Sequence, residues 1–272
     1  MNTTMQKVMA TYGHGTENDF VLVFDPDEKI SISDAEVAAI CNRESGIGSD
    51  GLIRITKPHN GRWFMDYRNA DGSIAEMCGN GIRVMARYLV ERGYQNEGIF
   101  AIETRAGLKH LRVPAVGDIT VNMGQVSLED DEIAVSAHGN QWVGQNINVG
   151  NPHAVVFVNS LDEVGDLKEA PIVTPTDSYP EGVNVEFVEF VKDRDLKMRV
   201  FERGVGETRS CGTGTCAVAL AATIARKEKL PARWIIYPPG GRLEVEIDTH
   251  SNATLTGPAV LLNEYDITSY LS

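Results

Sequence analysis

The chain has 272 residues, 42% of them hydrophobic and 23% charged, and carries a formal net charge of −13. This is enough apolar material for a large core, and the length favours two domains over one. The acidic balance argues against a nucleic-acid-binding protein, which usually carries a basic face. No apolar run approaches the roughly 18 residues of a membrane span, and residues 1–10 lack a signal-peptide core, so we expect a cytoplasmic protein that contacts no membrane.

Three helices are predicted along the chain. The first opens at Ser33, where Glu36 completes a capping box, and it runs through Cys41. The second covers 80–92 and stops at a glycine, and the third covers 213–227 and stops before a proline. Segments rich in Val, Ile, Phe and Trp are predicted as strands. These strands are 20–24, 52–56, 62–68, 109–113, 154–158, 185–191, 196–202, 233–237 and 243–247.

The chain repeats itself at one offset, 211 − 78 = 133 residues. The pairs that hold this offset are Asn18 and Asn151, Cys78 and Cys211, Gly107 and Gly240, and Gly124 and Gly257. The simplest architecture is two similar α/β domains, 1–117 and 118–261, that face each other across a cleft, with 262–272 returning to the first domain as a strand. One continuous domain whose strands merely look alike is the alternative.

Both repeated cysteines, Cys78 and Cys211, stand just before a predicted helix. A helix N-terminus carries unpaired backbone N–H groups and a partial positive charge, which favours the thiolate over the thiol. The glycines that follow each cysteine let the backbone come close to a ligand, and a substrate carboxylate can rest on these N–H groups. The sequence therefore predicts two thiols of lowered pKa at two anion-binding helix starts.

Two facing domains would bring these helix starts into one cleft. An α-carbon held between the sulfurs can lose its proton to one thiolate and gain a proton from the opposite thiol, which inverts the stereocentre without a cofactor. The carbanion needs oriented N–H donors and exclusion of water. Cys78 and Cys211 are therefore predicted to be the catalytic pair.

Other roles for cysteines stay open. A core thiol is an ordinary role, and we assign it to Cys41 and Cys216. Zinc needs ligands at suitable spacing, which Cys211 and Cys216 do not provide, so no metal site is predicted. A cysteine hydrolase could use His153 as its base but would leave one cysteine unexplained. Neither glycine-rich segment ends in the Gly-Lys-Ser/Thr of a phosphate loop.

Polar residues near the cysteines are predicted to bind the substrate. Asn69 and Glu202 each precede a repeated cysteine by the same spacing, so the repeat aligns them at strand ends beside the cleft. Arg203 can bind a carboxylate as a fork and Glu202 can receive an ammonium group, although a solvated surface pair is the alternative. Asn184 aligns with Gly51, which breaks the symmetry of the two halves. The remaining candidates, each otherwise a turn or structural residue, are Asn18, Asn151 and His153.

Two signatures in the chain resemble those of diaminopimelate epimerases. The matching segments are 69–73 (NADGS) with 77–81 (MCGNG), 202–208 (ERGVGET) with 211–214 (CGTG), 151–153, and 182–184. The resemblance covers nearly the whole chain. It implies two pseudo-symmetric α/β (α+β) domains, each a mostly antiparallel, β-barrel-like sheet around a central helix. It also implies interconversion of LL- and meso-2,6-diaminopimelate, for lysine and peptidoglycan precursors, with no pyridoxal phosphate or other cofactor.

The resemblance implies a role for each candidate residue. Cys78 and Cys211 would be the two bases, with Cys78 the thiolate that acts on the LL isomer. The residues that would read the distal end of the substrate are Asn18, Asn69, Asn151, Asn184, Glu202 and Arg203. Those that would offer N–H groups to the proximal carboxylate are Gly79, Asn80, Gly212 and Thr213. His153 would lie close to the reacting centre. Gly51 departs from the glutamine of many members, which puts one substrate contact in doubt.

Three other functions stay open. A two-cysteine racemase acting on proline or hydroxyproline would share the thiols, although such relatives tend to have His where Asn80 stands and do not need the pair formed by Glu202 and Arg203. A non-catalytic amino-acid-binding protein would share the fold, as would a redox sensor that joins Cys78 and Cys211 in a disulfide. The expected partner is small-molecule diaminopimelate, and a homodimer remains open.

Overall fold

The computed structural model describes residues 7–58 and 60–272. Its helices are α1 (Asp34–Cys41), α2 (Gly79–Glu91) and α3 (Gly212–Ala225). The first strands are β1 (Met9–Gly15), β2 (Asn18–Phe24), β3 (Gly51–Thr56), β4 (Phe64–Asn69), β5 (Gly98–Thr104) and β6 (Gly107–Val113). Next come β7 (Ile119–Gln125), β8 (Ser127–Leu128), β9 (Ile133–Ala137), β10 (Asn140–Asn148), β11 (Pro152–Phe157), β12 (Ile172–Thr174) and β13 (Asn184–Lys192). The last are β14 (Asp195–Glu202), β15 (Gly206–Thr208), β16 (Ala232–Tyr237), β17 (Leu243–Ile247), β18 (Asn252–Gly257) and β19 (Val260–Asp266).

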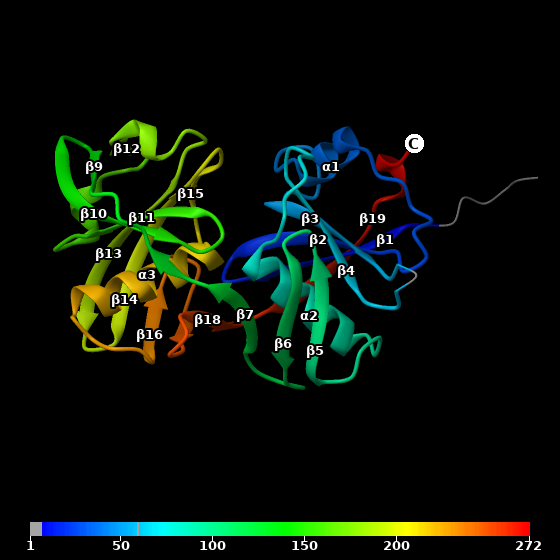
Figure 1. Ribbon diagram of the computed structural model, residues 1–272. Coiled ribbons are helices and arrows are strands. Elements are labelled where there is room, and N and C mark those ends of the chain that lie inside the picture. Colours follow the sequence, from blue (N-terminus) through cyan, green and yellow to red (C-terminus); the bar gives the residue numbers. More distant parts are fainter. Residues whose placement is uncertain (1–6, 59) are drawn as a thin grey trace, which may run out of the picture. The chain divides into compact units, whose positions relative to one another are not determined.

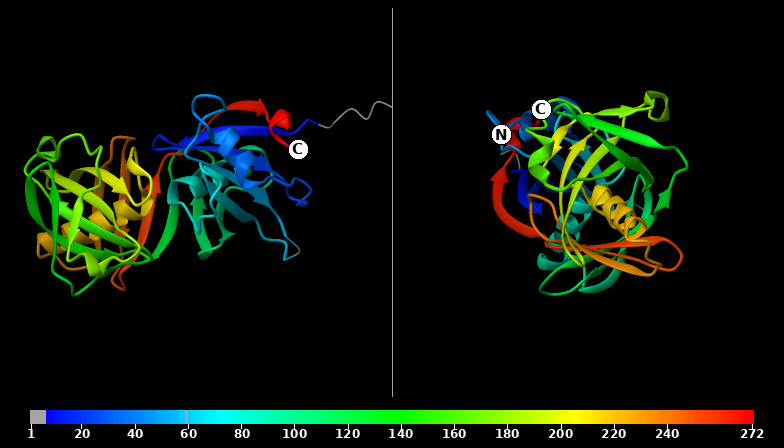
Figure 2. Two further views of the ribbon diagram at one scale, coloured as in Figure 1. Left: turned by 90° about the horizontal axis from the view of Figure 1, so that it is seen from above. Right: turned by 90° about the vertical axis from the view of Figure 1, so that its left-hand side faces the viewer.

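The chain divides into two compact units. The first runs to Ile119 and takes back Pro258–Ser272, and the second is Thr120–Gly257. In the first unit β19 pairs with β1, β1 with β2, β3 with β4, and β5 with β6, all antiparallel, while β2–β3 and β4–β5 are parallel. The views in Figure 2 show the red strand β19 alongside the blue strand β1. A late segment of the chain thus completes the sheet of the first unit.

The second unit repeats this order of pairings. Strands β10–β11, β13–β14 and β16–β17 are antiparallel, and β11–β13 and β14–β16 are parallel. The register agrees residue by residue: Phe20 lies opposite Gly51, and His153 opposite Asn184, each residue 133 positions further along. The fold class is therefore confirmed, since both units are mostly antiparallel sheets built on the same plan.

Helix α2 lies at the centre of the first unit. It packs against β1, β2, β3, β6 and β19, and every residue from Gly79 to Leu89 is buried. Burial extends beyond the apolar face of the helix, because two arginines on it bond to backbone carbonyls. Arg83 donates to the oxygens of Gly79 and Pro258, and Arg87 donates to those of Pro114, Ala115 and Gly117. Five strands of the first unit therefore pack against this helix, which Figure 1 shows among them.

Helix α3 takes the same position in the second unit, packed against β10, β11, β13, β16, β17 and β18. Most of its buried residues from Gly214 to Thr223 are small, which lets the strands approach closely. The Thr223 hydroxyl accepts a hydrogen bond from the Trp234 indole at 2.9 Å and so fixes the helix against β16. Both central helices begin at the glycine after a repeated cysteine, and this places the two thiols.

The capping box predicted for the first helix is confirmed: Ser33 caps α1, and the Glu36 side chain accepts from the Ser33 backbone N–H. Within the described part of the chain, no helix is long and apolar enough to cross a membrane.

Candidate active site

Both repeated cysteines are the N-cap residues of the central helices. Cys78 has φ −130° and ψ 120°, and Cys211 has φ −124° and ψ 120°. Each Sγ accepts a hydrogen bond at 3.4 Å from the backbone N–H three residues ahead, at Gly81 and Gly214 respectively. Each thiol therefore lies at the positive end of a helix, with the same local geometry in both units.

In the first unit an asparagine connects Cys78 to the strand beside it. The carbonyl oxygen of Asn18, at the start of β2, accepts from Cys78 Sγ at 3.5 Å and from Asn80 Nδ2 at 3.1 Å. The Asn18 amide nitrogen donates to Asp50 at 2.6 Å, and Asp50 accepts from Arg43 at 2.7 Å. This network fixes which end of the Asn18 amide faces the thiol.

The network continues to Asp19, a residue that the sequence analysis did not single out. Burial raises the pKa of the Asp19 carboxyl, but hydrogen bonds from Arg43 and Tyr12 outweigh it and leave that pKa below its ordinary value. Both terminal guanidinium nitrogens of Arg43 donate to Asp19, at 3.1 and 2.9 Å. Asp19 therefore stays ionised and anchors the arginine that holds Asp50.

Asn69 takes part in a turn. Its amide donates to the Ser73 hydroxyl at 3.0 Å, and its backbone N–H donates to the Ser73 carbonyl at 2.9 Å. Its counterpart Glu202 lies instead against the second thiol, so the two aligned positions have different surroundings in the two units.

Gly51 has no room for a side chain. A Cβ there would lie 2.5 Å from the Arg68 carbonyl oxygen and 2.7 Å from a ring carbon of Tyr67. Tyr67 is buried and packs edge-on against Phe20, with ring centroids 5.9 Å apart. The Tyr67 ring thus fills the space that a glutamine side chain at position 51 would need. Glycine at this position and tyrosine at position 67 therefore fit each other.

Replacing Gly51 by alanine is therefore expected to destabilise the first unit by about 1–3 kcal/mol, the usual cost of overpacking. Urea unfolding followed by circular dichroism measures this. An alanine variant as stable as the parent would show that β3 and β4 shift apart freely and that Tyr67 does not define this position.

In the second unit Cys211 is buried among polar groups. Its Sγ lies 3.5 Å from the Thr213 hydroxyl, which accepts from Asn151 Nδ2 at 3.4 Å. The Glu202 carboxylate forms a hydrogen bond with Cys211 and accepts from the Thr208 hydroxyl at 2.5 Å. The hydrogen bond between Asn151 and Thr213 thus corresponds to the one between Asn18 and Asn80 in the first unit. The second unit differs in that the Glu202 carboxylate also contacts the thiol.

These surroundings reverse the expected ionisation of Cys211. Burial raises the pKa of the thiol well above its ordinary value, and the charges of Glu202 and Glu186 raise it further, while bonds from Thr213 and Gly214 lower it only in part. Burial also raises the pKa of the Glu202 carboxyl. The prediction of a lowered pKa at both helix starts is therefore wrong for Cys211, which holds its proton at neutral pH.

The other candidates of the second unit lie at different depths. Asn184, which is buried, accepts from the Arg203 backbone N–H at 2.9 Å through its carbonyl oxygen. The Arg203 guanidinium is partly exposed and donates to the Glu181 carbonyl at 3.3 Å. His153 is fully buried, with Nδ1 2.6 Å from Glu186 and Nε2 3.0 Å from Asn151. Its two ring nitrogens are therefore occupied by protein partners.

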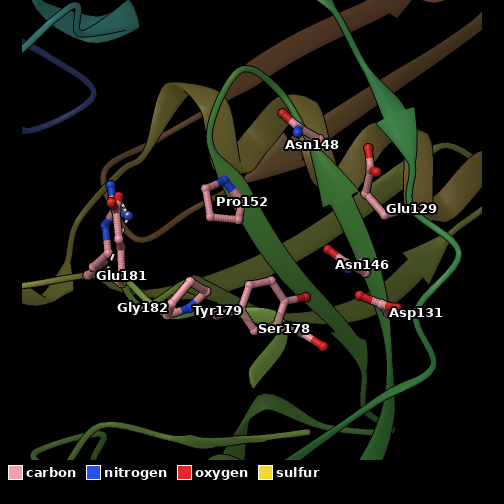
Figure 3. A pocket seen from close by; sticks show the side chains of 11 residues that line it. Glu129, Asp131, Asn146, Asn148, Pro152, Ser178, Tyr179, Glu181 and Gly182 are labelled. Atoms are coloured by element: carbon pink, nitrogen blue, oxygen red, sulfur yellow. Dashed lines mark hydrogen bonds and ion pairs between the residues drawn. The ribbon is translucent and has the colours of Figure 1, made fainter. Parts of the chain in front are cut away.

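A cavity of about 310 Å³ opens beside Arg203 in the second unit (Figure 3). Glu129 and Asp131 lie on one side of it and Glu181 and Gly182 on the other. Its lining residues are Glu129, Asp131, Asn146, Asn148, Pro152, Ser178, Tyr179, Pro180, Glu181, Gly182 and Arg203. Cys211 is not among them, so this cavity reaches the arginine but not the thiol.

Residues 7–58 and 60–272 contain no group of three or more His, Cys, Asp or Glu placed to hold a metal ion. All four cysteines lie in this part and are thiols, with Cys41 and Cys216 buried. The backbone N–H groups of Gly79, Asn80, Gly212 and Thr213 belong to the first turns of α2 and α3.

Comparison with known proteins adds to this geometry. The family model for diaminopimelate epimerase matches residues 10–129 and 145–262. The chain is 46% identical to a diaminopimelate epimerase of Streptomyces coelicolor over 94% of both chains, and 44% identical to one of Thermobifida fusca over 94% of this chain and 96% of the relative.

Solved structures share the fold at low identity. A PhzF-family phenazine biosynthesis protein of Bacillus anthracis has a TM-score of 0.76 at 17% identity, covering 96% of this chain and 99% of its own. A hydroxyproline epimerase of Agrobacterium vitis has a TM-score of 0.70 at 17% identity, covering 96% of this chain and 92% of its own. The family match and the identities above 40% are decisive: the chain belongs to the diaminopimelate epimerase family.

Proposed function

We propose that this protein interconverts LL- and meso-2,6-diaminopimelate by moving a proton between Cys78 and Cys211. The observation that carries the proposal is the repeated N-cap thiol, each Sγ accepting a helix N–H at 3.4 Å. Membership of the family and the names of its relatives support the substrate. The proposal requires the two half-sites to face one cleft, with the α-carbon between the sulfurs.

The two thiols have different tasks in the proposed reaction. Burial and the carboxylates of Glu202 and Glu186 favour the protonated form of Cys211, which suits it to donate the proton while Cys78 takes the α-proton as a thiolate. We assign this direction to the LL isomer, as the resemblance to the family implies. The product leaves with the thiols in exchanged states, and the reverse reaction uses them in the opposite order. The N–H groups at Gly79, Asn80, Gly212 and Thr213 would hold the carboxylate and the charge that develops on it.

The distal end of the substrate would meet the remaining polar residues. Glu202 would receive its ammonium group and Arg203 its carboxylate, the pairing that each charge favours. Amides that would complete this end are those of Asn18, Asn69, Asn151 and Asn184. His153 would act through Asn151 and would not contact the substrate through its ring nitrogens, since protein groups bond both of them.

The test is proton NMR of the purified protein with LL-diaminopimelate in D2O under reducing conditions. We expect the meso isomer to form with one deuterium at the inverted α-carbon, because the donating thiol exchanges its proton with solvent. Proline, trans-4-hydroxyproline and glutamate are run alongside. Inversion of proline or hydroxyproline without inversion of diaminopimelate would reassign the chain to the racemases, and binding without exchange would make it a non-catalytic binding protein.

The proposed setting is the cytoplasm, in the supply of lysine and peptidoglycan precursors. Cytoplasmic reductants would keep both thiols reduced, as a two-thiol reaction demands. A homodimer remains a prediction, which sedimentation of the full chain tests.

A further inference from the structure

A carboxylate to which the proposed mechanism gives no contact with the substrate is buried beside the second thiol. Glu186 lies in β13, two residues after Asn184, and is fully buried. Its Oε1 is 2.6 Å from His153 Nδ1, and its Oε2 has no hydrogen-bond partner in the described part of the chain. Burying a carboxylate in this way is costly, so its position calls for a role.

Side chains connect this carboxylate to Cys211 in unbroken sequence. His153 Nε2 lies 3.0 Å from the Asn151 carbonyl oxygen, the Asn151 amide nitrogen donates to the Thr213 hydroxyl at 3.4 Å, and that hydroxyl lies 3.5 Å from Cys211 Sγ. A change at Glu186 can therefore reach the thiol through three intervening residues.

Glu186 also lies against the helix turn that holds the thiol. A Cβ at Gly214 would be 2.5 Å from Glu186 Oε1, and Gly214 N–H is the donor to Cys211 Sγ. The ionisable groups that face Glu186 come from several elements: His153 on β11, Glu202 on β14, Cys211 at the start of α3, and Tyr179 before β13. Glu186 thus belongs to the electrostatic surroundings of the thiol.

The first unit has no such pair. At the positions 133 residues earlier stand Phe20 and Ile53, both fully buried and apolar, in strands with the same parallel register. The two halves therefore share a backbone plan but differ in what lies behind the thiol: aromatic and aliphatic side chains in one, and a hydrogen-bonded acid and imidazole in the other.

We propose that Glu186 is a positioning residue which, through His153 and Asn151, orients Thr213 and Cys211 and makes Cys211 the proton-donating thiol. This rests on the proposed function, but it concerns a difference between the two thiols that is measurable without turnover. In the first unit Phe20 and Ile53 stand at the equivalent positions, so no such hydrogen-bonded pair lies behind Cys78. The two units therefore share one fold but carry acid/base groups with different surroundings.

The test is the pH dependence of iodoacetamide alkylation at each cysteine, resolved by peptide mass spectrometry, in the full chain. In Glu186→Gln the negative charge near Cys211 is lost, so we expect its alkylation midpoint to move to lower pH and its rate at fixed pH to rise several-fold, while the rate at Cys78 stays within about twofold. With diaminopimelate we expect kcat to fall about tenfold and KM to change little, because geometry rather than binding is disturbed.

Two further variants keep the result interpretable. The double variant His153→Phe/Glu186→Ile carries the side chains that stand at the equivalent positions of the first unit, so it is expected to fold. It is also expected to show the same shift of the Cys211 alkylation midpoint to lower pH. Glu189→Gln is the matched control on the same strand, where the carboxylate accepts from the Leu161 N–H at 3.0 Å, and it is expected to leave both readouts unchanged.

An unchanged alkylation profile at Cys211 in folded Glu186→Gln would overturn the proposal. Equal shifts at both cysteines would also overturn it, because they would indicate that the whole structure is destabilised. A parent protein inactive on diaminopimelate but showing the selective shift would refute the proposed function and leave this inference intact.

Discussion

Serine at position 78 or 211 is expected to lower the rate of diaminopimelate epimerisation by about 10²–10⁴-fold, the usual contribution of one general acid or base. Serine is close to cysteine in size, and its hydroxyl oxygen can accept the helix N–H in place of the sulfur, but an alcohol is too weak an acid to form the needed anion near neutral pH. Because each inversion needs both groups, either substitution should block both directions of the reaction. The measurement is the D2O exchange rate of each isomer by NMR.

Cys216→Ala is the matched control, since Cys216 is a buried thiol on α3 to which no catalytic role is assigned. It should keep nearly full activity at the cost of some stability, and circular dichroism should show that all three variants are folded. Activity near that of the parent in either serine variant would rule out the two-base mechanism.

Glu202→Gln is expected to lower kcat/KM about a hundredfold, since one charged hydrogen-bond partner contributes roughly 1.5–3 kcal/mol. The loss should appear mainly in KM if Glu202 binds the ammonium group of the substrate. Removing the carboxylate should also lower the pKa of Cys211, which its charge raises, so this cysteine should alkylate faster at neutral pH. Stopped assays over substrate concentration and cysteine-resolved alkylation measure the two effects.

The pH dependence of stability gives a second readout for Glu202. Burial raises its pKa above the unfolded value, so its contribution to stability is present at low pH and is lost as pH rises through the folded pKa. In Glu202→Gln this loss of stability with rising pH should disappear, because glutamine does not titrate. The control is Glu207→Gln, where the carboxylate pairs with Arg199 at 2.6 Å. Equal kinetic effects in the two variants would contradict a binding role for Glu202.

Much of the fold could be predicted, because the central helices and the β-branched strands have strong local patterns. The strand β1 could not: its sequence, MATYGHG, contains two glycines and little apolar periodicity. It is extended because β2 and β19 hydrogen-bond to its two edges, and Gly13 is needed there since a Cβ would lie 2.6 Å from the Val260 oxygen. Such tertiary support leaves no local signal.

The thiols and their asparagines could be found from the repeat, but their supporting residues could not. Asp50 reaches Asn18 from the end of a loop, and Glu186 reaches His153 across a parallel ladder, so both contacts depend on strand register. One signal was present: Glu186 interrupts an apolar run in a strand. The ionisation of Cys211 was missed for the same reason, since burial and the carboxylates of Glu202 and Glu186, which the fold brings near the thiol, decide it.

Strand β19 has a consequence for the order of folding on the ribosome. The sheet of the first unit needs Val260–Asp266 along the edge of β1, yet the whole second unit is translated before that segment emerges. At about 5–20 residues per second, the delay is on the order of 10–30 s. During this time β1 exposes unpaired backbone groups, so the half that is synthesised first is the half that finishes last, and nascent chains are open to mispairing at that edge.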